Sequence, residues 1–188
     1  MVIASAFISA TGSYAYIRNT LRGTTKPNRV SHFLWAFAPI LATGAAISAG
    51  ADIWATARIF LSGLMPLLIL LASLSNPNSY WKLGAFDYLC GLCSLIAIGF
   101  WLVAGSPIAA ILLFATSDAF AAIPTIVKAF KAPETETRIT FLLSTLSVAL
   151  AMPSIPVWNI QNSAFQLYLL GVNLIIVFAL YRPRYSRK

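Results

Sequence analysis

Long apolar stretches alternate with short polar breaks along the chain. Most of the apolar stretches approach the roughly 20 residues that an α-helix needs to cross the hydrocarbon core of a bilayer. Glycine, proline, asparagine or aspartate, which end helices or form turns, occur in every break. The apolar windows cover residues 2–17, 31–50, 53–74, 84–104, 107–127, 138–152 and 162–181. The pattern therefore predicts an all-α integral membrane protein with seven transmembrane helices.

The positions of the basic residues test this helix count, because cytoplasmic loops of membrane proteins carry an excess of lysine and arginine. Lysine or arginine occurs in the first, third and fifth connections and in the tail, and in none of the other connections. Of the 13 lysines and arginines, only Arg58 lies away from this side. We therefore expect a multi-pass protein of the inner or plasma membrane, with its N-terminus outside and its C-terminus in the cytoplasm.

The first apolar stretch differs from a signal peptide, which carries its basic residues before the apolar region. Here Arg18 and Arg22 follow the apolar region instead. We expect this stretch to be the first transmembrane helix.

Composition agrees with lipid as the surrounding solvent. Apolar residues make up 59% of the 188 residues and charged residues only 10%, whereas a soluble domain carries about 25% charged residues. The net charge of +8 comes from short clusters between the apolar windows. Such clusters suit anionic lipid headgroups rather than nucleic acid, which binds a continuous basic face. The expected partners are therefore the lipid bilayer and a solute, and the formation of a homo-oligomer stays open.

Two parts of the sequence resemble each other. Each contains a helix end, a basic turn, a proline and the polar start of the next helix, once around Pro27 and once around Pro133. Nearly the same offset separates Gly63 from Gly171, which indicates a duplicated three-helix unit. The fourth window is then a linker that restores a parallel orientation of the two units. The predicted organisation is a 3+1+3 arrangement of pseudo-symmetric three-helix bundles: a first bundle in 1–76, a linker helix in 77–105, and a second bundle with a basic cytoplasmic tail in 106–188.

This plan resembles the PQ-loop superfamily, which contains the SWEET (MtN3) sugar transporters, their half-size bacterial relatives, amino-acid exporters and KDEL receptors. The chain looks like a divergent bacterial-type member. At the place of the Pro-Gln dipeptide that names the superfamily, the second half has Pro124 followed by Thr125, and the first half has Ala15 followed by Tyr16. Pro39 and Pro124 match prolines in the second and fifth helices of SWEET transporters. The resemblance implies two bundles that enclose a transport path.

Asp118 is the most informative single residue. It lies about 15 Å from Lys128, at 1.5 Å per helical residue, and hence near the middle of the fifth window. A carboxyl group at that depth is costly, so we expect it to face the protein interior or a water-filled cavity. Acidic residues on pore-lining helices carry protons in proton-coupled relatives within the superfamily, which implies the same role for Asp118. The alternative is a structural carboxyl group that is hydrogen-bonded to neighbouring serine or threonine.

Arg58, Asn173 and Trp35 are the other candidates for a substrate or proton path. Arg58 either extends to water at the outer boundary or binds substrate, and its pairing with Asp118 stays open. Asn173 matches one of the paired asparagines with which SWEET transporters hold a sugar, whereas the equivalent position in the first half is Met65. Its alternative is a polar contact between helices. Trp35 is either an interfacial anchor or a ring on which substrate stacks.

The remaining polar candidates are interpreted as structural. His32 is expected to lie at the membrane boundary, and Asp87 to be solvated or paired with Lys82. Cys90 and Cys93 are expected to pack as small apolar residues, because two ligands cannot complete a tetrahedral zinc site and there is no second cysteine pair. We expect neither a metal nor a cofactor.

These observations predict a small membrane transporter that moves a small polar solute by alternating access, with Asp118 as a candidate proton carrier. Pro39, Pro66 and Pro124 are the candidate hinges. The alternative is a non-transporting membrane receptor or accessory binding protein on the same scaffold. An enzyme is not expected, because the sequence has neither the common hydrolase and metalloprotease motifs nor paired catalytic carboxylates.

Overall fold

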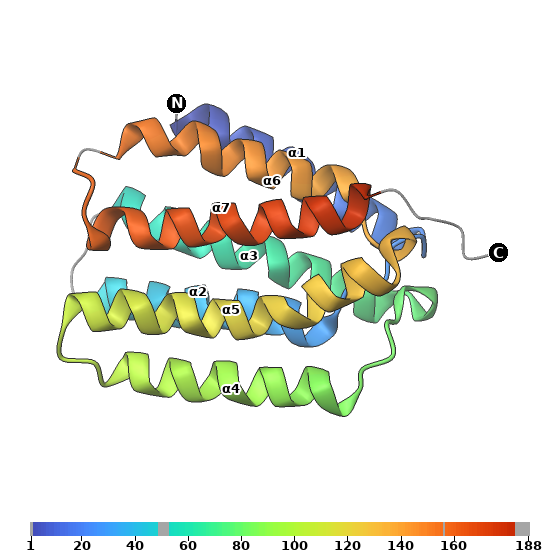
Figure 1. Ribbon diagram of the computed structural model, residues 1–188, viewed down its shortest axis with the longest axis horizontal. Coiled ribbons are helices and arrows are strands. Elements are labelled where there is room, and N and C mark those ends of the chain that lie inside the picture. Colours follow the sequence, from blue (N-terminus) through green and yellow to red (C-terminus); the bar gives the residue numbers. More distant parts are fainter. Residues whose placement is uncertain (1, 49–52, 156, 183–188) are drawn as a thin grey trace.

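The computed structural model describes residues 2–48, 53–155 and 157–182, which form a bundle of helices (Figure 1). Within this part of the chain the structure is all-α, with seven α-helices, three short 3₁₀ helices and no strand. The predicted all-α class and the prediction of seven helices are confirmed for this part of the chain. The predicted break at Asp52, most of the basic tail and the side chain of Arg58 lie outside the described residues.

Each predicted apolar window corresponds to one α-helix. The helices are α1 (Val2–Leu21), α2 (Arg29–Ser48), α3 (Ile53–Ser75), α4 (Ala85–Leu102), α5 (Pro107–Lys131), α6 (Arg138–Ala151) and α7 (Ile160–Tyr181). The 3₁₀ helices η1 (Pro77–Ser79), η2 (Pro133–Thr135) and η3 (Met152–Ser154) lie in the connections. Proline occupies the first turn of α5, η1 and η2, where its missing N–H would have no helical partner in any case.

Three helices of the described part are long and apolar enough to cross a membrane. They are α4 and the segments Ile108–Lys131 of α5 and Asn162–Tyr181 of α7. The segments Ile59–Ser75 and Arg138–Ser154 are also apolar but shorter. A membrane location is therefore supported by α4, α5 and α7.

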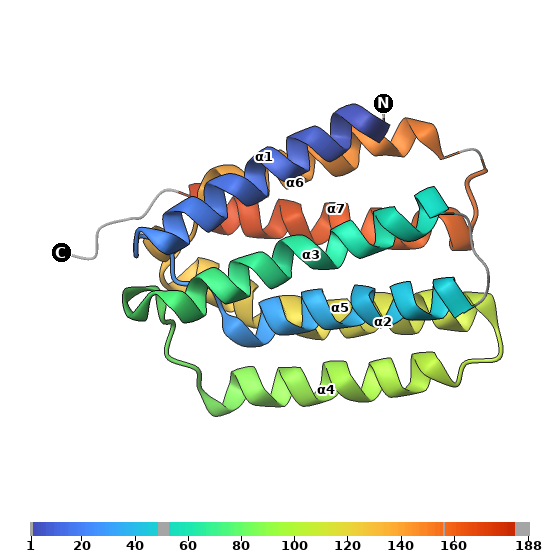
Figure 2. The ribbon, with the colours of Figure 1, turned by 180° about the vertical axis from the view of Figure 1, so that it is seen from behind.

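The helices pack in a regular order (Figures 1 and 2). In the first half of the chain α3 packs against both α1 and α2, and in the second half α7 packs against both α5 and α6. The halves meet where α1 packs against α6 and where α2 packs against α5. The remaining helix, α4, lies at the edge of the bundle, where it packs along α5 and touches α2. The helices α1 and α7 run in the same direction (Figure 1). We call the end of the bundle at which these two helices begin its N-terminal end, and the end at which they finish its C-terminal end.

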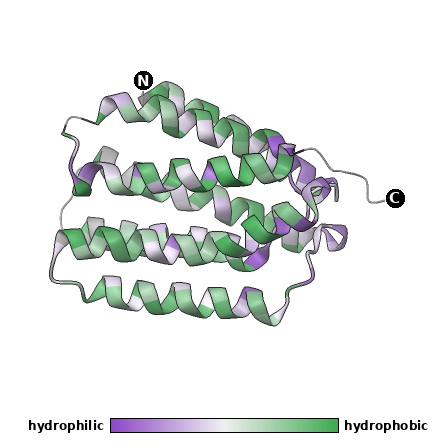
Figure 3. Cartoon of the chain, in the orientation of Figure 1, coloured by the Kyte–Doolittle hydropathy of each residue, from purple (hydrophilic) through white to green (hydrophobic). Residues whose placement is uncertain are grey.

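The outer faces of the helices are apolar. Figure 3 shows hydrophobic residues along the length of the helices, whereas hydrophilic residues gather mainly at the C-terminal end of the bundle. Large side chains such as Phe100 on α4 and Phe178 on α7 are more than half exposed. Contiguous exposed apolar surface of this kind needs an apolar partner, and lipid is the partner that suits helices of this composition.

Glycine permits close approach where α2 meets its neighbours. A Cβ atom at Gly63 on α3 would lie 3.0 Å from the carbonyl oxygen of Ala36, and one at Gly91 on α4 would lie 2.9 Å from a methyl group of Val30. Both distances are shorter than ordinary van der Waals contact, so no larger residue fits without a shift. Small residues at helix contacts are typical of membrane bundles.

Candidate functional site

A central cavity of about 350 Å³ lies between the two halves of the bundle. Side chains from α1, α2, α3, α5, α6 and α7 line it, and α4 contributes none. A second cavity shares part of this wall, including Ser9, Met65 and Ser147, and extends to Ser5 and Asn162 near the starts of α1 and α7. The central cavity therefore continues toward the N-terminal end of the bundle.

Asp118 supplies the one acidic side chain among the described residues that line the central cavity. Its Oδ2 atom accepts a hydrogen bond of 2.8 Å from the hydroxyl group of Tyr168 on α7. The indole of Trp35 on α2 lines the same cavity and interacts with this carboxyl group. Three helices thus converge on a single carboxyl group in the cavity wall.

Aromatic rings surround this carboxyl group. Phe114 lies one helical turn before Asp118 on α5, and its ring centroid is 5.0 Å from that of Phe165 on α7. Phe165 in turn lies 5.9 Å from Tyr168. Trp35, Phe114 and Phe165 all line the cavity, so the wall around Asp118 is mainly aromatic.

The other predicted path residues have different positions. Asn173 lines the cavity, but its Nδ2 atom donates a 2.9 Å hydrogen bond to the carbonyl oxygen of Leu169 on its own helix. Pro39 and Pro66 line the cavity from α2 and α3. Pro124 is buried and is not part of the cavity wall. Each of the three prolines removes one backbone hydrogen bond inside its helix.

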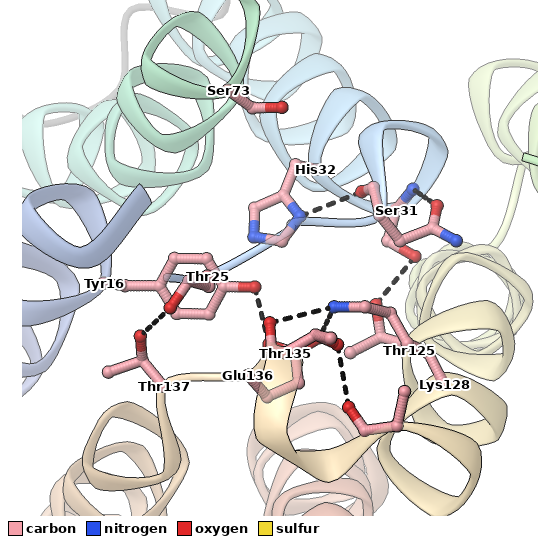
Figure 4. A network of polar contacts seen from close by, with 12 residues as sticks. Tyr16, Thr25, Ser31, His32, Ser73, Thr125, Lys128, Thr135, Glu136 and Thr137 are labelled. Atoms are coloured by element: carbon pink, nitrogen blue, oxygen red, sulfur yellow. Dashed lines mark hydrogen bonds and ion pairs between the residues drawn. The ribbon is translucent and has the colours of Figure 1, made fainter. Parts of the chain in front are cut away.

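Lys128 and Glu136 form a buried ion pair within a network of polar contacts (Figure 4). The Lys128 ammonium group on α5 donates to Glu136 Oε1 at 2.6 Å, and both side chains are almost completely buried. The hydroxyl group of Tyr16 on α1 donates to the other carboxylate oxygen, also at 2.6 Å. The face of Trp81 lies 5.2 Å from the Lys128 ammonium group. The ion pair thus joins α1 to the second half of the chain.

Further hydrogen bonds connect the two halves around this ion pair. The Thr25 and Thr137 hydroxyl groups lie 2.6 Å apart, and the Thr125 hydroxyl group donates to Ser31 at 2.9 Å. The backbone N–H of Lys26 donates to the carbonyl oxygen of Thr135 at 2.9 Å. We call this set the polar layer: Tyr16, Thr25, Lys26, Ser31, Thr125, Lys128, Thr135, Glu136 and Thr137. Tyr16 of this layer also lines the cavity, so the layer borders the cavity on the side of the Lys128–Glu136 pair.

His32 lies between the cavity and the polar layer. Its ring is 5.4 Å from the Tyr16 ring and 5.3 Å from the Trp35 ring. The Nδ1 atom lies 3.0 Å from the carbonyl oxygen of Asn28, which can only accept, so Nδ1 carries a proton. The interpretation of His32 as a membrane-boundary residue is wrong, because its side chain is buried inside the bundle and lines the cavity.

Asp87 also differs from its prediction. It is neither solvated nor paired with Lys82, because its carboxylate is buried and accepts from the Asn28 side chain and from the backbone N–H of Gly84, both at 2.7 Å. The bond to Gly84 satisfies an N–H group at the start of α4, and the bond to Asn28 fixes α4 to α2. Asp87 is therefore a structural carboxylate.

Two expectations concern metals and thiols. Cys90 and Cys93 are free cysteines, and Cys90 is buried against its neighbours. Among the described residues, no group of three or more histidine, cysteine, aspartate or glutamate side chains is placed to hold a metal ion.

Sequence reasoning missed several residues of the cavity and the polar layer. The sequence places Lys128 and Glu136 near the same basic connection but does not indicate that they pair, although Glu134 and Glu136 are the only acidic residues in any basic connection. Tyr168 and Phe165 have no local signal, because they meet Asp118 and Phe114 only through the packing of α7 against α5.

Comparison of the chain with family models, with curated proteins and with solved structures gives no match.

Proposed function

We propose that this chain is a small multi-pass membrane transporter that moves a small polar solute through the central cavity by alternating access. The observation that carries the proposal is the cavity itself. Six helices from both halves of the chain line it, it contains a carboxyl group, and it continues toward the N-terminal end of the bundle. Ligand sites in transporters lie at such interfaces between repeated units near the middle of the membrane.

The packing order supports the 3+1+3 arrangement of two three-helix bundles. The third helix of each half packs against the other two, and each contact between the halves has an equivalent: α1 with α6 corresponds to α5 with α2. This is the pattern that a two-fold relation between α1–α3 and α5–α7 would produce. The edge position of α4 suits a linker helix that takes no part in the path. We propose membership of the PQ-loop superfamily on this basis.

The orientation follows from the charges. We propose that all seven helices cross the inner or plasma membrane, with the C-terminal end of the bundle in the cytoplasm. Hydrophilic residues gather at that end, and cytoplasmic connections are the basic ones. The described conformation is then open to the outside and closed to the cytoplasm by the polar layer.

Alternating access requires the polar layer to separate and the opposite end of the cavity to close. Pro39 on α2 and Pro66 on α3 lie at the cavity wall, where a missing backbone hydrogen bond lowers the cost of bending. Pro124 on α5 lies close in sequence to Lys128 and Thr125 of the polar layer. Bending at these prolines would move the layer without unfolding a helix.

The test is solute flux through the purified protein in liposomes. We expect uptake of at least one member of a panel of labelled amines, amino acids, sugars and carboxylates, with Asp118→Asn altering the rate and its dependence on pH. Glu134→Gln, which removes an exposed carboxylate outside the cavity, is the control and should leave flux unchanged.

Flux that is identical in Asp118→Asn and the unmodified protein at every pH would remove Asp118 from the mechanism. Saturable binding of a panel member without flux of any member would contradict transport and favour the receptor alternative.

A further inference from the structure

We propose that the ligand of the central cavity is a small protonated amine whose ammonium group binds Asp118. The inference rests on the proposed role of the cavity as the solute site and adds the chemical class of the solute. Four properties of the cavity support it: the charge of the wall, its hydrogen-bonding groups, its aromatic side chains and its volume.

The charge of the wall favours a cation. Asp118 is the only acidic residue, and no lysine or arginine is present, among the described residues that line the cavity. The nearest buried cation in the polar layer, Lys128, is already paired with Glu136. An anionic solute would therefore meet one carboxyl group and no compensating positive charge, whereas an ammonium group can form a charge-assisted hydrogen bond with that carboxyl group.

The hydrogen-bonding capacity of the wall favours a ligand that donates. Asn173 donates to the carbonyl oxygen of Leu169, Thr140 to that of Gly12 and Ser147 to that of Ser5. Thr140 and Ser147 have used their single O–H hydrogen on the protein, and Asn173 has used one of its two N–H hydrogens. All three keep oxygen lone pairs, which accept.

Two further residues of the cavity wall have also used their hydroxyl hydrogen on the protein. Ser62 donates to the carbonyl oxygen of Ile59, and Tyr16 donates to Glu136. A sugar needs both donors and acceptors around its hydroxyl groups, and a carboxylate needs donors only. A primary ammonium group has three N–H donors and no acceptor, so it can use the lone pairs of these residues and the Asp118 carboxyl group together.

The aromatic rings add a second attraction for a cation. Phe114 lies about 6 Å along the helix axis from Asp118, at four residues of 1.5 Å each, and its ring packs against that of Phe165. Trp35 on α2 lines the same cavity and interacts with the carboxyl group. Ring faces attract cations within about 6 Å, and the same rings can hold an apolar body attached to the amine.

The volume of the central cavity indicates the size of the group that fits beside Asp118, while the second cavity extends this space toward the N-terminal end of the bundle. At about 30 Å³ for each water-sized group, a cavity of 350 Å³ holds roughly a dozen such groups. It lies at the small end of the range of ligand pockets. A primary amine with one ring or a short branched chain would fill it.

The test compares three probes of the same shape and different charge: benzylamine, which is protonated at neutral pH, benzyl alcohol and benzoate. Binding to the purified protein in lipid nanodiscs is measured by isothermal titration calorimetry. We expect saturable binding of benzylamine, at least 10-fold weaker binding of benzyl alcohol and no detectable binding of benzoate. Equal or tighter binding of the alcohol or of benzoate, or no binding of benzylamine, would overturn the inference.

The variant Asp118→Asn tests the residue. It should weaken benzylamine binding at least 10-fold and leave benzyl alcohol binding within 2-fold, and Glu134→Gln should change neither. Benzylamine binding that survives Asp118→Asn would overturn the assignment. If Asp118→Asn does not fold, the comparison of the three probes on the unmodified protein still decides the charge of the ligand.

Failure of this inference can be told from failure of the proposed function. Liposome flux of a neutral or anionic solute without binding of benzylamine would contradict the amine and keep the transporter. Binding of benzylamine with no flux of any solute would keep the amine site and contradict transport.

Discussion

Replacing Glu136 with leucine would remove the acidic partner of the buried ion pair in the polar layer. The Lys128 ammonium group and the Glu136 carboxylate lie 2.6 Å apart, with side-chain exposures of 1% and 0%. The variant leaves the Lys128 charge buried, and it also takes the acceptor from the hydroxyl group of Tyr16. Both effects oppose the folded, closed conformation.

The expected cost follows from this burial. Removing one partner of a buried ion pair lowers stability by about 3–5 kcal/mol, because the remaining charge has lost its solvent and its counter-ion. The lost hydrogen bond of Tyr16 adds to this cost, although contributions within one network do not add simply. The double variant Lys128→Met with Glu136→Leu buries no unpaired charge. It should be more stable than Glu136→Leu alone by at least about 2 kcal/mol.

The assay is reversible unfolding of the purified protein in detergent, followed by the tryptophan fluorescence of each variant. Lys131→Met, which removes an exposed lysine three residues along the same helix, is the matched control and should cost less than about 1 kcal/mol. A cost below about 1 kcal/mol for Glu136→Leu, or a double variant as unstable as the sum of its single variants, would refute the buried-pair reasoning.

Two other predictions concern the packing of the bundle. Asp87→Leu should lower stability by about 1–3 kcal/mol in the same unfolding assay, because the Asn28 amide and the Gly84 N–H lose their acceptor; a neutral effect would contradict the structural role of this carboxylate. Gly63→Ala and Gly99→Ala should change the stability of the bundle in opposite directions. The added methyl group at Gly63 meets the Ala36 carbonyl oxygen at 3.0 Å and should destabilise, whereas Gly99 has open space around it and should gain up to about 1 kcal/mol from helix propensity; equal effects would contradict the packing of α3 against α2.

The helices could be predicted from the sequence because their signal is local. Each consists of a long apolar stretch between breakers, and Pro107 and Pro133 mark the first turns of α5 and η2. Asp118 could be singled out for the same reason, since a lone carboxyl group inside an apolar stretch is costly wherever the helix lies. It lines the central cavity.

The partners of these residues could not be predicted, because they depend on the rotation and contact of whole helices. Tyr168 reaches Asp118 from fifty positions away, and Tyr16 reaches Glu136 from 120 positions away. Composition rules that place tyrosine and lysine at membrane boundaries assign Tyr16 and Lys128 to lipid headgroups. In the folded bundle the two side chains instead share one buried carboxylate, that of Glu136.

The central claim is that the cavity is a solute path that opens to one side of the membrane at a time. Ser13 on α1 lines the cavity, so Ser13→Cys in a background without Cys90 and Cys93 reports on access to it. A membrane-impermeant thiol reagent is applied separately to right-side-out and inside-out vesicles. The account predicts labelling from the outside, little labelling from the cytoplasmic side across the polar layer, and protection by a bound solute. Equal labelling from both sides, or labelling from neither, would contradict it.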